Sequence, residues 1–145
     1  MAYHWFIGHD GTVKNAHSED FVCDNSGNWI MNQRSIAICL AGDFTKEEPT
    51  SMQIVSLANL ISDIQGRWGI PDERIIHHWE VTPKHTVCPR IDLRNRAFTL
   101  RREKMSERIA QLQKAYERSS MARKARISRL LDRLQKLTPN YPVSI

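Results

Sequence analysis

The sequence lacks the features that mark several large classes of protein. It holds no apolar run of about eighteen residues, the length that a membrane-spanning helix requires. Its start, MAYHWFIGHD, lacks the basic segment and long apolar stretch of a secretory leader, so we expect synthesis in the cytoplasm. Only three cysteines are present, Cys23, Cys39 and Cys88, and this odd, sparse set argues against a disulfide framework. A reducing compartment or a metal-bound thiolate fits them better.

Basic residues are scarce in the first hundred positions and abundant afterwards. Residues 1–100 hold nine Lys and Arg against twelve Asp and Glu, whereas residues 101–145 hold twelve against four. An acidic body with a basic C-terminal segment indicates that the segment contacts something anionic or acidic. A solvated helical face would show the same composition, and both interpretations are open.

Runs of aromatic and β-branched residues predict short strands at 3–7, 35–41 and 75–78. The run at 35–41, SIAICLA, is continuously apolar, which is typical of a strand buried on both faces. Residues 12–33 are polar and rich in turn formers, so they predict loops with short strand pieces.

One helix is predicted clearly between the second and third strands. Thr50 is a predicted N-cap, and apolar residues then recur at helical spacing as far as Ile64. Trp68 lies four residues further on the same face, and Gly69 ends the helix. The order of elements predicts an α/β domain in which helices flank a mixed central sheet.

The apolar pattern divides the chain into three parts. Residues 1–100 form the predicted domain, residues 101–138 a basic amphipathic helical extension, and residues 139–145 an irregular tail that begins at a proline. The apolar stripe of the extension slips at Ser119 and Ser120, so two helices or one kinked helix would both fit.

Residues 77–92, HHWEVTPKHTVCPRID, gather three histidines, a cysteine, a glutamate and a lysine. Zinc takes imidazole and thiolate ligands at about 2.0–2.3 Å, with three from protein when the site is catalytic. His78 ends a predicted strand, and the loop after it can return Cys88 to the same point. Spacing alone leaves a coincidental pairing of the two residues as the alternative.

Three ordered segments resemble the zinc-dependent N-acetylmuramoyl-L-alanine amidases, the superfamily of peptidoglycan recognition proteins and short phage amidase lysozymes. They are YHWFIGHDGTV at 3–13, NQRSIAICLAGDF at 32–44 and IPDERIIHHWEVTPKHTVCP at 70–89. The resemblance covers residues 3–92 and implies the amidase fold, a Zn²⁺ cofactor and peptidoglycan as substrate. The implied reaction is hydrolysis of the bond between N-acetylmuramic acid and L-alanine, at the cell wall, after lysis or delivery.

The resemblance also implies roles for single residues. His78, the histidine of the His-x-Glu pattern, and Cys88, which precedes a proline, match metal ligands, and His77 matches a neighbour that is not a ligand. Tyr3 matches a tyrosine near the metal, where it would orient water or stabilise the oxyanion. Lys84 or Thr86 would stabilise the same developing charge.

Two further positions bear on the implied chemistry. Glu80 is interpreted as a group that orients His78, with an ordinary surface carboxylate as the alternative. Cys39 stands where some bacterial members carry a catalytic glutamate, so the chain is similar to the branch that uses tyrosine.

The family's first metal ligand, a histidine at the end of an earlier strand, has no counterpart, because only Met1 and Ala2 precede Tyr3. Three explanations are open: the chain is a piece of a longer protein, His9 or His17 supplies the third ligand, or the metal site is lost. The alternative function is therefore a catalytically inactive amidase fold that binds peptidoglycan or a protein partner.

The basic extension lies outside the part that resembles the family. An anionic wall polymer, a membrane surface or a protein partner would each suit its charge. Nucleic acid is disfavoured, because no aromatic stacking pattern accompanies the basic residues. Its apolar stripe would also suit self-association or packing against the domain, and we favour packing.

Overall fold

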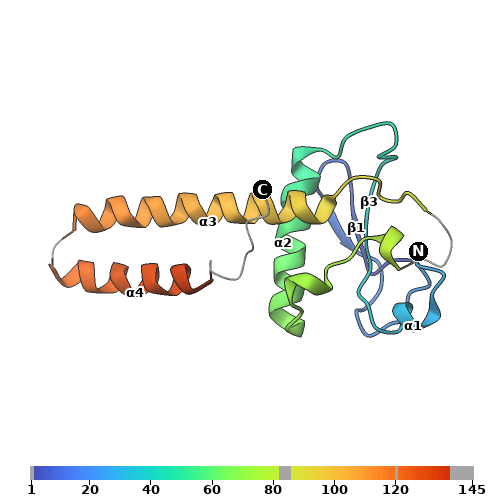
Figure 1. The fold of residues 1–145 in the computed structure, drawn as a ribbon, viewed down its shortest axis with the longest axis horizontal. Helices are drawn as coiled ribbons and strands as arrows, with labels where there is room; N and C mark the ends of the chain where they lie inside the picture. Colours follow the sequence, from blue (N-terminus) through green and yellow to red (C-terminus); the bar gives the residue numbers. More distant parts are fainter. Residues whose placement is uncertain (1, 82–85, 120, 138–145) are drawn as a thin grey trace. The chain divides into compact units, whose positions relative to one another are not determined.

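The computed structural model describes residues 2–81, 86–119 and 121–137 (Figure 1). The chain divides into two compact units, Met1–Phe98 and Thr99–Ile145, and the boundary falls inside a helix. The elements, in chain order, are β1 (Trp5–Ile7), β2 (Val13–Asn15), α1 (Trp29–Asn32), β3 (Ile38–Leu40), α2 (Ser51–Trp68), the 3-10 helices η1 (Asp72–Arg74) and η2 (His78–Glu80), α3 (Leu93–Glu117) and α4 (Met121–Leu137).

The three described strands form one sheet in the order β2-β1-β3. β1 pairs antiparallel with β2 and parallel with β3, so the sheet is mixed, as the sequence predicted. The central strand carries Ile7, whose side chain is fully buried. The predicted α/β fold with helices beside a mixed sheet is confirmed.

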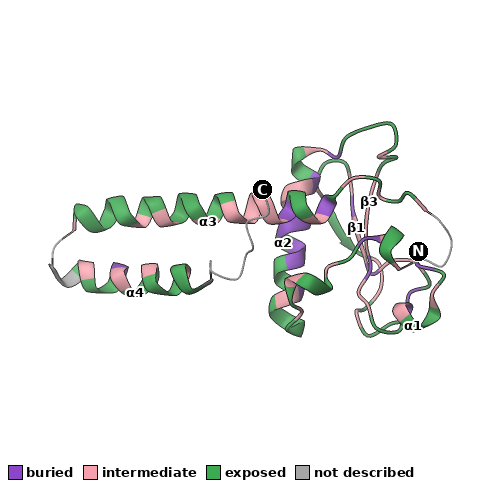
Figure 2. Ribbon diagram, in the orientation of Figure 1, coloured by how far each residue is buried: buried purple, intermediate pink, exposed green. Residues whose placement is uncertain are grey.

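Helix α2 begins and ends where the sequence predicted. The Thr50 hydroxyl accepts from the Gln53 amide at 3.1 Å, and the Gln53 side chain accepts from the Thr50 amide at 3.0 Å, so a capping box starts the helix. Gly69 ends it at φ 64°, a left-handed conformation that glycine adopts without steric cost. The buried apolar stripe of α2 is visible in Figure 2 and consists of Leu57, Ala58, Leu60, Ile61 and Ile64.

Trp68 does not continue this buried stripe. Its side chain is 52% exposed, and its indole N–H donates to the Glu19 carboxylate at 2.6 Å. Glu19 also accepts from the Trp5 indole at 2.8 Å and from the Arg67 guanidinium. One carboxylate therefore joins β1, the loop after β2 and the end of α2.

Two strand predictions were wrong in part. β3 is only three residues long, and all three residues are half-buried, so the strand is not buried on both faces as the sequence predicted. At the predicted strand 75–78, the backbone of Ile75 and His77 is extended, but no described strand pairs with it, and η2 begins at His78. Extended backbone becomes a strand only when a neighbour accepts its hydrogen bonds.

The second unit contains the rest of α3 and α4, so the apolar stripe of the extension forms two helices. In α4, Ile127 is buried while Leu130 is 41% exposed. The Lys124 ammonium lies 5.3 Å from the centre of the Tyr116 ring across the turn between the helices. None of the described helices is apolar over a length that would cross a bilayer. The predicted tail at 139–145 lies outside the described residues.

Candidate functional site

A short backbone link brings the two predicted metal ligands into neighbouring segments. The Trp79 amide donates to the Cys88 carbonyl at 3.1 Å, which ties η2 to the loop that carries Cys88. His78 is the first residue of η2 and is half-buried, whereas Cys88 is exposed. The predicted return of the loop to the histidine segment is therefore present at the level of the backbone.

Tyr3, Cys39 and Cys88 influence one another's ionisation. Burial raises the pKa of the Tyr3 hydroxyl, and the nearby Cys39 and Cys88 thiols raise it further. Burial also raises the pKa of Cys39, with a smaller contribution from Cys88, and burial raises the pKa of Cys88. The three groups, one phenol and two thiols, come from the lead into β1, from β3 and from the Cys88 loop.

Thr86 lies directly beside Cys88. Its hydroxyl accepts from the Cys88 amide at 3.2 Å, and the residue is half-buried. The Cys88–Pro89 peptide bond that follows is cis. Lys84, the other candidate for charge stabilisation, lies outside the described residues.

The structure gives Glu80 a different neighbour from the one the sequence suggested. Its carboxylate accepts from the His77 amide and lies 3.1 Å from His77 Nδ1, and the Arg94 guanidinium is 3.4 Å away. No bond between Glu80 and His78 is present in the part of the chain that the structure describes. Partial burial acts to raise the pKa of Glu80, but the bond from the His77 amide and the Arg94 charge outweigh it, so the pKa is lowered. Glu80 therefore orients the neighbouring histidine and the segment around it.

His77 is the centre of a buried polar cluster that the sequence did not reveal. Its ring is 6% exposed, stacks on the Trp79 ring at 4.3 Å between centroids, and accepts from the Arg94 amide at 3.3 Å. Burial lowers the pKa of His77, with a further lowering by the Arg94 charge. The Arg94 side chain also donates to the Ile75 carbonyl at 2.8 Å, so the cluster fixes residues 75–80 against the start of α3. Arg94 lies 14 to 19 residues from its partners in this cluster, which is why periodicity could not predict these contacts.

His4 is a second buried histidine, and its role is structural. It is fully buried, its Nδ1 accepts from the Ala37 amide at 2.9 Å, and its Nε2 lies 2.8 Å from the Phe21 carbonyl. Because an amide only donates and a carbonyl only accepts, the ring is neutral with its proton on Nε2. The ring thereby joins the segment before β3 to the loop at Phe21.

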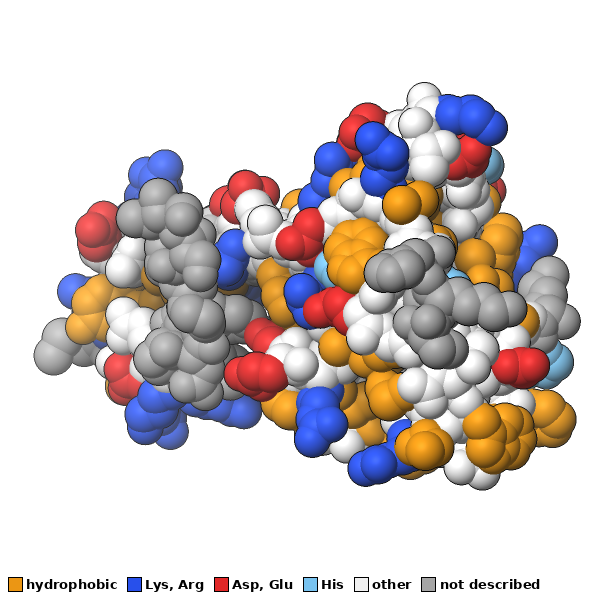
Figure 3. Space-filling model, turned by 45° about the vertical axis from the view of Figure 1, so that its right-hand side comes forward, with side chains coloured by type: hydrophobic (Ala, Val, Ile, Leu, Met, Phe, Trp, Pro, Cys, Tyr) orange, Lys and Arg blue, Asp and Glu red, His pale blue; other side chains and the backbone are white. Residues whose placement is uncertain are grey.

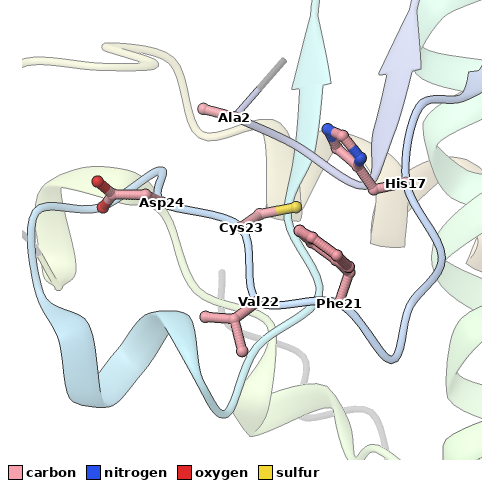
Figure 4. Close-up of a pocket in the computed structure, with 6 residues that line it drawn as sticks. All are labelled: Ala2, His17, Phe21, Val22, Cys23 and Asp24. Carbon is pink, nitrogen blue, oxygen red and sulfur yellow. The ribbon is translucent and has the colours of Figure 1, made fainter.

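The two histidines considered as a third ligand lie in other surroundings. His9 is exposed in the turn after β1, where its carbonyl accepts from the Thr50 hydroxyl at 2.8 Å. His17 stacks on the Phe21 ring at 5.5 Å, beside an open pocket of about 480 Å³. Figure 4 shows the six residues that line it, Ala2, His17, Phe21, Val22, Cys23 and Asp24.

The described residues do not supply a complete zinc site. Catalytic zinc takes three protein ligands, and structural zinc takes four. Within residues 2–81, 86–119 and 121–137, no three His, Cys, Asp or Glu side chains are grouped so that they could hold an ion. His78 and Cys88 are two suitable donors in adjoining segments, and neither His9 nor His17 joins them in such a group. Among the described residues, the donor set for the zinc that the resemblance implied is therefore incomplete, with two donors where a catalytic site takes three.

Comparison with known proteins assigns the chain to a family. Residues 1–91 match the family described as N-acetylmuramoyl-L-alanine amidase, so more than half of the chain is covered and the chain belongs to this family. Members of the family are generally zinc-dependent. The resemblance of the three sequence segments to these amidases is confirmed.

Individual relatives agree with this assignment. The endolysin of Enterobacteria phage K11 is 31% identical over 98 residues, which are 64% of this chain and 61% of the relative. Among solved structures, the N-acetylmuramoyl-L-alanine amidase LysC from Clostridium intestinale URNW is similar at 26% identity and a TM-score of 0.52. That similarity covers 57% of this chain and 53% of LysC. The endolysine N-acetylmuramoyl-L-alanine amidase LysCS from the same organism is similar at the same identity and TM-score, and that similarity covers 57% of this chain and 52% of LysCS. The chain thus spans between half and two thirds of the length of these relatives.

Proposed function

We propose that this protein acts on peptidoglycan as an endolysin-type amidase that hydrolyses the bond between N-acetylmuramic acid and L-alanine. The observation that carries the proposal is the family match over residues 1–91, which contain Tyr3, His78, Thr86 and Cys88. The relatives named above are amidases and endolysins, which supports the same substrate class. The protein would be made in the cytoplasm and would reach the wall after lysis or delivery.

The proposed roles follow from chemistry that amide hydrolysis requires. The tetrahedral intermediate carries a developing negative charge, which preorganised hydrogen-bond donors stabilise. The Tyr3 hydroxyl, half-buried and near Cys88, is our candidate donor. The Thr86 hydroxyl is a second candidate, because it is held beside Cys88 by the Cys88 amide. His78 and Cys88 are the proposed metal donors, and a complete zinc site needs at least one more.

A second function has its own support. The absence of a three-donor group from the described residues favours an amidase fold that binds peptidoglycan without cutting it. Such a protein would keep the surface that recognises the wall and lose hydrolysis. The two functions predict the same partner and differ in the products.

The test is incubation of the purified full chain with peptidoglycan sacculi, with and without added zinc chloride. An amidase releases new α-amino groups of L-alanine and no new reducing sugar ends, so both groups are quantified by chemical labelling. Zinc per chain is measured in parallel by elemental analysis, for the wild type and for His78→Ala and Cys88→Ala.

Three outcomes separate the two functions. New amino groups that depend on zinc and disappear in His78→Ala support the amidase. Sedimentation of the protein with sacculi without new amino groups overturns the amidase and supports the binding function. Neither binding nor release contradicts both proposals.

A further inference from the structure

Helix α4 carries an excess of positive charge on one face. Its 17 residues include six Lys and Arg and a single acidic residue, Asp132. Four of the basic residues follow one another at intervals of three or four positions, so they share one face of the helix: Arg126, Arg129, Arg133 and Lys136. At 1.5 Å per residue, this basic stripe runs along the helix axis for about 15 Å.

No carboxylate neutralises the basic stripe within the part of the chain that the structure describes. Its four side chains are exposed, and none of them forms an ion pair with a described Asp or Glu. The Arg129 guanidinium donates to the Ala125 carbonyl at 3.2 Å, which leaves its charge uncompensated. In α3, by contrast, acidic and basic residues are mixed, as at 103–108, EKMSER. α4 therefore attracts an anionic partner more strongly than the mixed surface of α3 does.

An exposed leucine borders the basic stripe. The apolar residues of α4 recur at helical spacing, and they are Ile127, Leu130, Leu131 and Leu134. Ile127 is buried and the last two are half-buried, but Leu130 is 41% exposed. Since Leu130 lies four residues after Arg126 and three before Arg133, these two arginines are its neighbours on the helix surface. By the same periodicity, Asp132 is on the other flank of the stripe, away from Leu130.

The chemistry of this surface indicates the kind of partner that it fits. Three of the four stripe residues are arginines, whose planar guanidinium groups bind phosphate oxygens in pairs. A soluble phosphate polymer would contact these arginines and leave Leu130 in water. A phospholipid surface offers phosphate groups with acyl chains directly beneath them, so it accommodates both features. Basic helices with an apolar flank are typical of segments that lie in the plane of a membrane surface.

We propose that the basic stripe and Leu130 bind the surface of an anionic phospholipid bilayer. The arginines contact lipid phosphates, and Leu130 enters the boundary between the headgroups and the acyl chains. Each basic residue near such a surface strengthens binding about fivefold. The surface lies outside the residues that match the amidase family, so it is independent of the proposed hydrolysis. Vesicle binding by a chain that leaves sacculi intact would support this proposal and overturn only the amidase.

The experiment is sedimentation of the full chain with lipid vesicles. One set of vesicles contains phosphatidylglycerol and phosphatidylcholine, and the other contains phosphatidylcholine alone. We expect binding to the anionic vesicles about tenfold or more above binding to the neutral ones. Raising the salt concentration from about 0.1 M to about 1 M shortens the Debye length from about 10 Å to about 3 Å, and should weaken this binding about tenfold or more.

Matched variants distinguish the stripe from the net charge of the chain. The double variant Arg126→Gln and Arg133→Gln should bind anionic vesicles about twentyfold more weakly, because two of the four stripe charges are removed. The double variant Lys104→Gln and Arg108→Gln removes the same charge from exposed positions of α3 and should bind as the wild type does. Glutamine is a helix former similar to lysine and arginine, and circular dichroism checks that both variants keep their helices.

A third variant tests the apolar part of the surface. Leu130→Gln should weaken binding to anionic vesicles about fivefold or more, since a polar side chain gains nothing from the acyl boundary. Inorganic polyphosphate is added as a soluble competitor at the same phosphate concentration as the lipid. Unchanged binding by Leu130→Gln together with full displacement by polyphosphate would identify a soluble polyanion as the partner and overturn the proposal. Equal binding to neutral vesicles, or equal losses in the α3 and α4 double variants, would overturn it as well.

Discussion

The two compact units are stabilised by contacts of different reach. In Met1–Phe98, side chains far apart in sequence meet, as when Arg67 binds Glu19 or His4 binds the Ala37 amide. In Thr99–Ile145, the described side-chain bonds are local, such as those of Ser119 and Arg129 to carbonyls four residues earlier. On the face drawn in Figure 3, hydrophobic and charged side chains are intermixed.

This difference between the two units indicates which helices depend on packing for their stability. Helices draw most of their stability in proteins from the packing of an apolar face, and α2 buries five apolar side chains in this way. In α4, Ile127 is the buried residue among positions 123–136, so a smaller share of the helix depends on packing. Substitutions in the first unit should therefore cost more than similar substitutions in the second.

The largest expected effect is at Ile7. Its side chain is fully buried in the central strand, so Ile7→Ala should lower the free energy of unfolding by about 3–4 kcal/mol. The matched change Leu130→Ala in α4 should cost less than about 1 kcal/mol, because that side chain is 41% exposed. Urea unfolding followed by tryptophan fluorescence and by circular dichroism measures both. Equal losses in the two variants would contradict the comparison.

The next effect concerns the carboxylate that joins three elements. Replacing it in Glu19→Gln should cost about 1–3 kcal/mol, because two indoles and a guanidinium lose a charged acceptor. The Arg67 bond above all lowers the pKa of Glu19 from 4.5 to about 2. As pH falls from about 4.5 to about 2, the unfolded chain therefore gains a proton that the folded chain does not.

The stabilisation by Glu19 is thus complete above about pH 4.5 and is lost as pH falls toward 2. Unfolding curves at several pH values should show this loss in the wild type and a smaller one in Glu19→Gln. Asp20→Asn, an exposed neighbour, serves as the control and should follow the wild type. An unchanged acid dependence in Glu19→Gln would show that other carboxyl groups dominate.

The smallest expected effect is in the second unit. Lys124→Ala removes the contact of an ammonium with the Tyr116 ring and should cost about 0.5 kcal/mol or less. Helix content by circular dichroism during heating measures the change, with the exposed Lys104→Ala as control. A loss above about 1 kcal/mol would mean that α4 depends on tertiary contacts as strongly as α2 does.

Local signals predicted some elements well. The helix from Thr50 to Gly69 was predicted at both ends, because a capping box and a left-handed glycine act within four residues of each end. The strand predicted at 3–7 is also present, although β1 begins at Trp5. Trp68 misled the prediction, since its spacing matched the apolar face while its indole is held by Glu19, 49 residues away. The short helix α1, Trp29–Asn32, was missed because four residues carry no periodic pattern.

The candidate site was predicted in part from local sequence motifs. Tyr3 and Cys88 came from motifs, and Cys88 contributes to the raised pKa of Tyr3, after burial and Cys39. The cluster of His77, Glu80 and Arg94 was not predicted. Arg94 contacts the other two residues from 17 and 14 positions away, and a single sequence does not reveal such contacts. Whether His78, Cys88 and Thr86 act as proposed stays a prediction, and Lys84 lies outside the described residues.

His4 has a consequence for the histidine chemistry of the whole protein. Both of its ring nitrogens are committed, one to the Ala37 amide and one to the Phe21 carbonyl, and no part of the ring reaches solvent. A reagent that acylates imidazoles, or a chelated nickel ion on a column, has no free lone pair to attack there. His4 therefore has a structural role in the folded chain, and reaction of its ring with such reagents would indicate that the fold has opened.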